Sequence, residues 1–489
     1  MNAHRSPERP VAVKVNNSMH RVECIHFVGI GGAGMGGIAE VLLNQGYRIT
    51  GSDIKKNGMS ERLQNLGASV YYSHSAENII DADVVVISTA IPLDNIEVVS
   101  AKEKRIPVVR RAEMLAELMR FQFGIAIAGT HGKTTTTSLV TSILAEADED
   151  PTFVIGGLLN SVQTNARLGE GKYLVAEADE SDASFHHLQP ILSVVTNIDV
   201  DHMDAYAGDV NILHQNFIDF LHNLPFYGAA VMCLEDEGVQ EVISKVHRRA
   251  VTYGLNEQAD IYATDIKYQN YQTHFKVVRK HQSDINIHLN LPGQHNVLNA
   301  LAAIAIAQEL SIDDEAIVKA LYEFKGIGRR FDVLGAVKIE NGNIQLVDDY
   351  AHHPRELEAT LKAARQVWPE RRIVSVFQPH RYTRTRDLMD DFVQVLSSNT
   401  DQLILTDVYP AGEKAIAKAD SASLTRAIRA RGDIEPILVS DLSEIARTIN
   451  SICKDNDVVI VMGAGNIGSV AKNLPLQIEE LLNAKGENA

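Results

Sequence analysis

One short segment, Ile127–Ser138 with the sequence IAGTHGKTTTTS, constrains the fold of this chain more than any other. An apolar run leads into its first glycine and a run with helical spacing follows its lysine, which predicts a strand, a tight loop and a helix. Backbone N–H groups in such a loop bind phosphate oxygens, Lys133 reaches the β- and γ-phosphates, and the Thr134 hydroxyl binds Mg²⁺. The segment therefore predicts an ATP site formed by Gly129, Thr130, His131, Gly132, Lys133, Thr134 and Thr135.

Two further apolar runs end in acidic residues, in the sequences YLVAEADESD and ILSVVTNIDVDHMD. The carboxyl ends of parallel strands meet at one edge of an α/β sheet, so these residues are expected to lie beside the phosphate loop. Glu177 is the best carboxylate ligand for Mg²⁺, and His202 could supply a nitrogen to a second ion. Zinc is disfavoured because no group of four Cys or His ligands occurs. Lys133, Glu177 and His202 are the predicted catalytic residues, and Thr134, Glu177 and His202 the predicted metal ligands.

A second glycine-rich loop lies near the N-terminus, in the sequence VGIGGAGMGG. Gly29, Gly31 and Gly34 follow a predicted strand and precede a predicted helix, and Asp53 ends the next strand. This pattern fits the ribose carboxylate and phosphate loop of an NAD domain, but the same glycines could admit the diphosphate of a UDP-sugar. A similar pattern, GAGNIG at 463–468, is interpreted as close packing, since no further βα unit follows it.

The order of predicted elements indicates three α/β domains, and 489 residues fit about three domains. We place a Rossmann-like domain at 1–124, a central ATP-binding domain at 125–327 and a second Rossmann-like domain at 328–489. Within the central domain, residues 259–291 alternate as in antiparallel strands. The C-terminal part has predicted strands at IQLVDDY, RIVSVFQ, QLILTDV, EPILVSD and DVVIVMGAG, which indicate a doubly wound sheet.

Composition excludes several classes of protein. The formal net charge of −17 disfavours a nucleic-acid or acidic-membrane partner, because there is no excess of cations to neutralise phosphates. Three scattered cysteines, and an N-terminus without an apolar signal segment, favour a cytoplasmic protein. The expected partners are small molecules, and the expected assembly is a monomer or a weak homodimer.

Seven motifs occur in an order that closely resembles the Mur ligases: GTHGKTTT, EADESD, NIDVDHMD, GQHNVLNALAA, GRRFD, DDYAHHPRE and QPHRYTRT. The resemblance extends from Gly29 to about Gly468. It implies an enzyme of peptidoglycan precursor synthesis that uses ATP and Mg²⁺ to join L-alanine to the lactyl carboxylate of UDP-N-acetylmuramate through an acyl phosphate. In this interpretation the first glycine loop holds the UDP diphosphate and the second holds ATP.

The resemblance also implies site residues beyond the two loops. Together with the glycines and Asp53 named above, the residues expected to bind the UDP-sugar form one set. This set is Gly29, Gly31, Gly32, Ala33, Gly34, Met35, Asp53, Ile54, His74, Ser88, Thr164, Asn165 and Arg167. Those implied for ATP in addition to the phosphate loop are His295, Asn296, Asn299, Arg330 and Asp349. Those implied for the amino acid are Tyr350, His352, His380, Arg381 and Arg384, of which the arginines suit a carboxylate because a guanidinium pairs with it bidentately.

Four other functions remain open at this point. A recycling ligase would attach a whole tripeptide to UDP-N-acetylmuramate, and a folate-type polyglutamate ligase would share only the central loop. An NAD-dependent dehydrogenase would leave Lys133 and Glu177 without a role, and a UDP-sugar sensor would use the first domain alone. The group that takes the ammonium proton is also open between His131, His202 and a nearby carboxylate.

Overall fold

The computed structural model describes residues 19, 21–161, 164–181, 183–201, 203–269, 271–280 and 282–486. His202 lies outside the described residues, so its predicted role stays a prediction. The chain divides into two compact units. Unit 1 comprises Met1–Leu158, Gln163–Gly254 and Ala302–Ile317, and unit 2 comprises Leu159–Val162, Leu255–Leu301 and Val318–Ala489.

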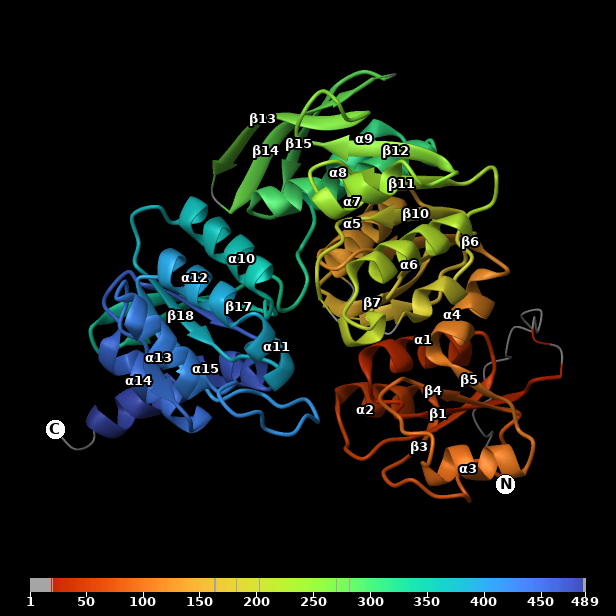
Figure 1. Ribbon diagram of the computed structural model, residues 1–489, viewed down its shortest axis with the longest axis horizontal. Helices are drawn as coiled ribbons and strands as arrows, with labels where there is room; N and C mark the ends of the chain where they lie inside the picture. The colour runs from red at the N-terminus through yellow and green to blue at the C-terminus, as the bar shows by residue number, and fades with distance from the viewer. Residues whose placement is uncertain are drawn as a thin grey trace, which may run out of the picture. The chain divides into compact units, whose positions relative to one another are not determined.

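The N-terminal part of unit 1 is a parallel five-stranded sheet with the strand order β3-β2-β1-β4-β5 (Figure 1). Its strands are β1 (Cys24–Val28), β2 (Arg48–Ser52), β3 (Ser69–Tyr71), β4 (Val84–Ile87) and β5 (Val108–Arg110), and its helices are α1 (Ala33–Asn44), α2 (Gly58–Leu66), α3 (Ile96–Glu103) and α4 (Arg111–Met119). The predicted strand, glycine turn, helix and strand at the start of the chain are confirmed.

Helices cover both faces of this sheet. Ile25 and Phe27 of β1 belong to the same buried cluster as Ile38 of α1 and Leu115 of α4. The next residue of β1, Val28, points the other way and joins a second buried cluster with residues of α3. All five residues of β1 are buried, as expected for a continuous apolar run in a parallel sheet. The glycine turn that follows β1 is therefore held at the carboxyl edge of a rigid sheet.

The rest of unit 1 contributes seven neighbouring strands of a second sheet, in the order β12-β11-β10-β6-β9-β7-β8. Its strands are β6 (Phe123–Ala128), β7 (Thr152–Leu159, whose last residue belongs to unit 2), β8 (Thr164–Arg167), β9 (Tyr173–Glu177), β10 (Leu192–Val195), β11 (Ala229–Cys233) and β12 (Arg249–Gly254). Its helices are α5 (Lys133–Glu146), α6 (Val210–His222), α7 (Glu237–Ile243) and the short 3₁₀ helices Ser184–His187 and Met203–Tyr206. Strand β6 pairs in parallel with both β9 and β10, so the segments that follow these three strands meet at one edge.

Unit 2 contains an antiparallel ribbon and the C-terminal sheet. The ribbon consists of β13 (Ile261–Gln269), β14 (Gln272–Arg279) and β15 (Ile285–Leu289), which confirms the predicted antiparallel segment. Helices α8 (Gln294–Glu309) and α9 (Asp314–Tyr322) contain residues of both units.

The C-terminal sheet has the order β16-β17-β21-β18-β19-β20. Its strands are β16 (Asp332–Ile339), β17 (Gly342–Asp349), β18 (Ile373–Phe377), β19 (Gln402–Thr406), β20 (Ile437–Val439) and β21 (Val458–Met462), and its helices are α10 (Pro354–Val367), α11 (Tyr382–Asp387), α12 (Met389–Asn399), α13 (Ser421–Arg431), the 3₁₀ helix Leu442–Glu444, α14 (Ile445–Ile452) and α15 (Ile467–Gly486). The five predicted strands are present, and with helices on both faces the sheet is doubly wound as predicted. An additional strand, β16, pairs antiparallel with β17 at the edge, so the sheet is mixed. Helices cover both faces, with α10, α12 and α13 on one and α14 and α15 on the other.

The glycines of GAGNIG serve close packing, as predicted. A Cβ atom built on Gly465 would lie 2.4 Å from Gln378 Oε1, and one on Gly468 would lie 2.2 Å from Arg329 Cζ. Arg329 also donates a hydrogen bond from Nη2 to the Gly463 carbonyl. Side chains at these two positions would displace neighbouring groups.

Among the described residues, no helix has both the length and the apolar character needed to cross a bilayer.

Candidate active site

Lys133 is held inside the phosphate loop by three oxygens. It begins α5, directly after Gly132, whose φ of +83° is a left-handed conformation that favours glycine. Its Nζ donates hydrogen bonds to the carbonyls of Gly129 (2.6 Å) and Thr130 (3.0 Å) and to Glu180 Oε2 (2.7 Å). The ammonium group is thus aimed at the centre of the loop. Thr134 and Thr135 occupy the following turn of α5 and are buried.

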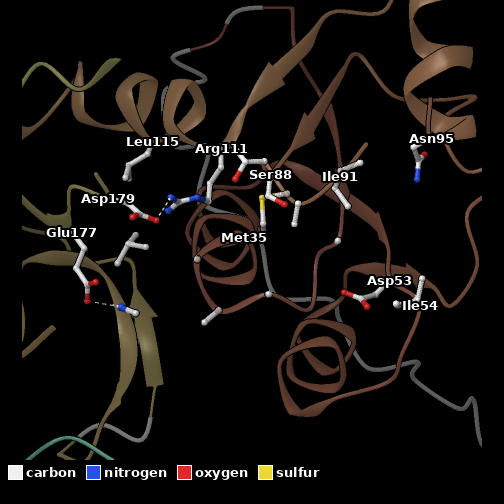
Figure 2. Close-up of a pocket in the computed structure, with 18 of the residues that line it drawn as sticks. Met35, Asp53, Ile54, Ser88, Ile91, Asn95, Arg111, Leu115, Glu177 and Asp179 are labelled. Carbon is white, nitrogen blue, oxygen red and sulfur yellow. Dashed lines mark hydrogen bonds and ion pairs between the residues drawn. The ribbon is translucent and has the colours of Figure 1, made fainter. Parts of the chain in front are cut away.

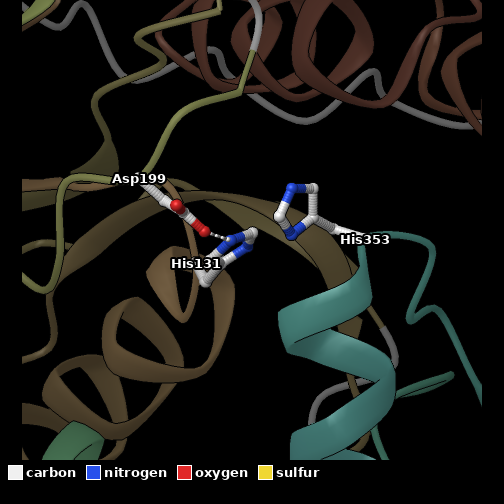
Figure 3. A group of neighbouring side chains, drawn as sticks. All are labelled: His131, Asp199 and His353. Atoms are coloured by element: carbon white, nitrogen blue, oxygen red, sulfur yellow. Dashed lines mark hydrogen bonds and ion pairs between the residues drawn. The ribbon is translucent and has the colours of Figure 1, made fainter. Parts of the chain in front are cut away.

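The segment that follows β10 fixes the loop from its other side. Asn197 Oδ1 accepts a hydrogen bond from the His131 N–H (2.8 Å), and Asn197 Nδ2 donates to the His131 carbonyl (2.9 Å). The imidazole of His131 lies with Nε2 3.1 Å from Oδ2 of Asp199 (Figure 3). This contact orients the His131 ring toward a buried carboxylate. The role of His131 as a base stays a prediction.

Three acidic residues lie at the end of the neighbouring strand β9 or directly after it. Glu177, its last residue, is in register with Ile127 at the end of β6, and its Oε1 accepts a hydrogen bond from the Gly156 N–H (2.7 Å). Asp179 and Glu180 come next, and Glu180 is the carboxylate that contacts Lys133. The edge predicted from two acidic strand ends therefore holds more carboxylates than Glu177 alone.

Electrostatics at this edge reflect burial and opposite charges. Burial raises the pKa of Glu180 to about 7, although Lys133 acts to lower it. Burial would lower the pKa of Lys133, but Glu180 and Asp179 raise it above its ordinary value. Burial would likewise raise the pKa of Asp179, but Arg111 and Lys133 bring it below its ordinary value. Lys133 is thus a cation whose charge is balanced locally by carboxylates.

A cavity of about 740 Å³ extends from the first glycine loop to these carboxylates (Figure 2). We call it the first cavity. At one end lie Asp53, Ile54 and Asn95, and at the other lie Glu177 and Asp179. Nine predicted UDP-sugar residues line it: Gly29, Gly32, Ala33, Gly34, Met35, Asp53, Ile54, His74 and Ser88.

The other four predicted UDP-sugar residues are not among those that line the first cavity. Gly31 donates its N–H to Asp53 Oδ2 (2.9 Å). Thr164 and Asn165 line a second cavity of about 660 Å³, formed with α2 and the Gly156–Leu158 segment of β7. Arg167 lines neither cavity, and its guanidinium forms an ion pair with Asp150.

No sequence motif pointed to Arg111, the first residue of α4. Its Nη2 lies 3.0 Å from Asp179 Oδ2, and the two side chains line the first cavity together (Figure 2). Glu180, Asp179, Asn197 and Asp199 were also missed, although each lies inside a quoted motif. Arg111 stands outside all of them, so only the folded chain brings it to the site.

His74 is held by a buried polar network around Glu97. Its Nδ1 lies 3.0 Å from Glu97 Oε2 and 3.0 Å from Ser52 Oγ, and Ser52 donates to the same carboxylate at 2.6 Å. Asn78 Nδ2 donates to Glu97 Oε1 (2.6 Å) and His26 Nε2 lies 3.7 Å from it. Burial alone would raise the pKa of Glu97, but His26, Ser52 and Asn78 lower it to about 2. The network therefore contains a buried carboxylate that stays ionised.

This network predicts a pH-dependent stability. The fully buried Glu97 has its pKa lowered from 4.5 to about 2, so we expect Glu97→Gln to reduce the free energy of unfolding by roughly 3 kcal/mol at pH 7. Because the folded-state pKa lies below the unfolded one, the contribution is complete above about pH 4.5 and is lost as the pH falls toward 2. Urea unfolding at pH 7, 5 and 3.5 measures it, with the exposed Glu103→Gln of the same helix as control. Equal losses in both variants would contradict it.

In unit 2, the residues predicted to bind ATP surround the start of α8 and the end of β17. Asn296 Nδ2 donates to the Pro292 carbonyl (2.7 Å) and Asn299 Nδ2 to Asn296 Oδ1 (3.2 Å). Burial and the positive charge of Arg330 lower the pKa of His295 to about 4, so this imidazole is neutral at pH 7. Burial raises the pKa of Asp349, against the effect of Arg330.

The predicted amino-acid residues form a row of rings beside α11 in the same unit. The rings of Tyr350 and His352 are 5.4 Å apart, and those of His352 and His380 are 5.7 Å apart. The buried Arg384 has Nη1 3.4 Å from His380 Nδ1. Arg381 precedes α11 with a φ of +68° and donates its N–H to the Tyr409 carbonyl. Four of the five predicted side chains are thus neighbours in space.

Comparisons with known proteins identify the fold family. Family models match for the Mur ligase middle domain at residues 127–307, the Mur ligase family catalytic domain at 24–123 and the Mur ligase glutamate ligase domain at 329–465. The UDP-N-acetylmuramate-alanine ligase MurC of Thermotoga maritima is 30% identical with a TM-score of 0.79, over 94% of this chain and 99% of that one. This chain belongs to the Mur ligase family.

Murein peptide ligases are also similar. The one from Psychrobacter arcticus is 25% identical with a TM-score of 0.69, over 93% of this chain and 98% of that one. The UDP-N-acetylmuramate:L-alanyl-γ-D-glutamyl-meso-diaminopimelate ligase of Neisseria meningitidis is 29% identical with a TM-score of 0.58, over 63% of this chain and 100% of that one.

Membership of the Mur ligases confirms three predictions. The chain has three α/β domains, and it is an ATP-dependent ligase that forms amide bonds in peptidoglycan precursor synthesis. The middle domain of this family binds ATP, as the segment at Ile127–Ser138 predicts. Substrates of Mur ligases are in general UDP-N-acetylmuramate derivatives together with amino acids or peptides. The dehydrogenase and sensor interpretations are wrong, since neither forms an amide bond.

Proposed function

We propose that this Mur ligase joins L-alanine to the lactyl carboxylate of UDP-N-acetylmuramate. The first cavity carries the proposal, because it extends from the glycine loop after β1 to Glu177 beside the phosphate loop. A UDP-sugar laid along it would place its uridine near Asp53 and Ile54 and its diphosphate at the start of α1, where helix N–H groups favour anions. Its lactyl carboxylate would then lie at the Glu177 end.

ATP would be held by the loop at Gly129–Thr135, with Lys133 on the terminal phosphates. The Thr134 hydroxyl and the Glu177 carboxylate fit Mg²⁺, because both supply the oxygen ligands that this ion prefers. When bound, Mg²⁺ would offset the negative charge of the triphosphate. Lys133 would have to exchange Glu180 for phosphate oxygens, and Glu180 is buried within the same site.

The chemistry would proceed in two steps. A carboxylate does not react with an amine at neutral pH, because oxide is a poor leaving group. Transfer of the γ-phosphoryl group of ATP to the lactyl carboxylate gives ADP and an acyl phosphate. Attack by the amine, after its ammonium group has lost a proton, then forms the amide bond and releases phosphate. The protein's part is to position the reactants and to stabilise charge on the transferred group, here through Lys133 and the loop N–H groups.

L-alanine as the amine is supported by likeness to the Thermotoga maritima enzyme over almost the full length of both chains. The row formed by Tyr350, His352, His380 and Arg384 in unit 2 would hold the small zwitterion, with the arginine on its carboxylate. The second candidate is attachment of the tripeptide L-alanyl-γ-D-glutamyl-diaminopimelate, favoured by likeness to two murein peptide ligases.

Phosphate release separates the two candidates. The enzyme is incubated with Mg-ATP and UDP-N-acetylmuramate, and then with L-alanine, with the tripeptide or with neither amine. We expect release with L-alanine only, together with a mass gain on the UDP-sugar that equals one alanine residue. Release with the tripeptide only would make the protein a recycling ligase and would contradict the proposed amino-acid site.

A further inference from the structure

The first cavity is strongly biased toward negative charge. Three carboxylates line it, those of Asp53, Glu177 and Asp179, whereas Arg111 is the only Lys or Arg among its lining residues, all of which lie in the described part of the chain. A ligand that carries a diphosphate adds further negative charge. Backbone N–H groups at the glycine loop supply only partial charges. A full positive charge in this cavity can come from Arg111.

Arg111 lies against the glycine loop as well as against Asp179. A Cβ atom built on Gly34 would lie 3.1 Å from Arg111 Nη1, so the guanidinium covers the first turn of α1. Gly32, the residue that caps this helix, has no side chain to accept the first N–H groups. The other nitrogen, Nη2, lies 3.0 Å from Asp179 Oδ2. The cation is thus fixed by a carboxylate at the place where the helix start favours an anion.

We propose that Arg111 binds the diphosphate of the UDP-sugar, with Asp179 as the residue that positions it. This inference rests on the proposed function, because it takes the first cavity as the UDP-sugar site. A guanidinium presents several N–H donors in one plane, which suits adjacent phosphate oxygens. Without Arg111, the diphosphate would face the carboxylates of Asp53 and Asp179 with no full positive charge between them.

The competing explanation is that Arg111 only ties α4 to the segment after β9 through its ion pair. The two explanations differ in what Asp179→Asn does. If Arg111 acts only through Asp179, then Asp179→Asn and Arg111→Met remove the same interaction and have the same effect. If Arg111 contacts the diphosphate, Asp179→Asn keeps the positive charge in the cavity and Arg111→Met removes it.

Isothermal titration calorimetry tests the proposal with UDP, UDP-N-acetylglucosamine and UDP-N-acetylmuramate as ligands, in the absence of ATP. We expect Arg111→Met to weaken the affinity for all three by about tenfold or more. Asp179→Asn keeps the positive charge but no longer holds it in place, so it should weaken the affinity for UDP by only about threefold. Arg48→Met is the matched control, because it removes another Arg–carboxylate pair of unit 1, that with Asp81, outside both cavities.

Each other outcome overturns a defined statement. Equal loss of UDP affinity in Arg111→Met and Asp179→Asn would mean that Arg111 has only a structural role, through its ion pair with Asp179. Loss confined to UDP-N-acetylmuramate would move the contact from the diphosphate to the sugar carboxylate, and no loss would remove Arg111 from the site. Failure of the wild-type protein to bind UDP or either UDP-sugar would instead overturn the proposed function. Retained ATP binding in Arg111→Met establishes that the variant is folded.

Discussion

Replacing Lys133 with Met should lower the rate of ATP-dependent ligation by about a thousandfold, because a positively charged hydrogen-bond donor is lost from the site of phosphoryl transfer. The ammonium group is already held by the carbonyls of Gly129 and Thr130 and by the carboxylate of Glu180. When ATP binds, the ammonium group therefore needs only to exchange its contact with Glu180 for one with phosphate. ADP formation in a coupled assay measures the loss. The exposed Lys172→Met, also in unit 1, controls for the loss of a lysine.

The Lys133 variant should remain folded. Glu180 would lose its partner, but its pKa is already about 7 because it is buried, and removal of the positive charge would raise that pKa further. The carboxyl group would therefore take up a proton rather than remain a buried anion. Thermal unfolding of Lys133→Met and of the double variant Lys133→Met/Glu180→Gln checks this. Folded protein with a rate within about tenfold of the wild type would mean that Lys133 does not act on the transferred phosphoryl group.

Much of the fold could be predicted because local sequence signals coincide with it. Continuous apolar runs such as CIHFV and VVIVM are buried strands of parallel sheets, and the glycines that follow them end those strands. The phosphate loop was recognised because its function depends on residues adjacent in sequence. Strand β16 was missed because its burial is irregular and it pairs only at a sheet edge, so its sequence carries no clear alternation.

The candidate site was predictable only in part, because some of its residues meet only in the folded chain and carry no local sequence signal. Lys133 and Glu177 belong to motifs that lie at the carboxyl ends of two strands, β6 and β9. The two strands are neighbours in the sheet, so the two motifs lie at the same edge. Arg111 starts a helix of the first sheet and meets Asp179, which is 68 positions away, so no spacing rule identifies the pair. Glu180 lies three residues beyond Glu177, but the choice between them as the partner of Lys133 depends on side-chain direction after the strand ends.

Replacing Arg384 with Met should have the second-largest effect, and on a different step. We expect kcat/KM for L-alanine to fall by about a hundredfold, since a charged bidentate contact to the amino-acid carboxylate would be lost. Arg384 is buried and adjacent to His380, which limits its ability to shift, whereas Arg386 on the same helix is exposed and pairs with Asp387. Arg386→Met is therefore the matched control and should stay close to the wild type.

Hydroxylamine distinguishes loss of amine binding from loss of phosphoryl transfer. It attacks acyl phosphates to form a hydroxamate, and it has no carboxylate for Arg384 to hold. With Mg-ATP, UDP-N-acetylmuramate and hydroxylamine, Arg384→Met should form the hydroxamate at nearly the wild-type rate, whereas Lys133→Met should form almost none. If hydroxamate formation in Arg384→Met falls as far as alanine ligation does, Arg384 acts before the amine arrives. The row of Tyr350, His352 and His380 beside it would then no longer be the amino-acid site.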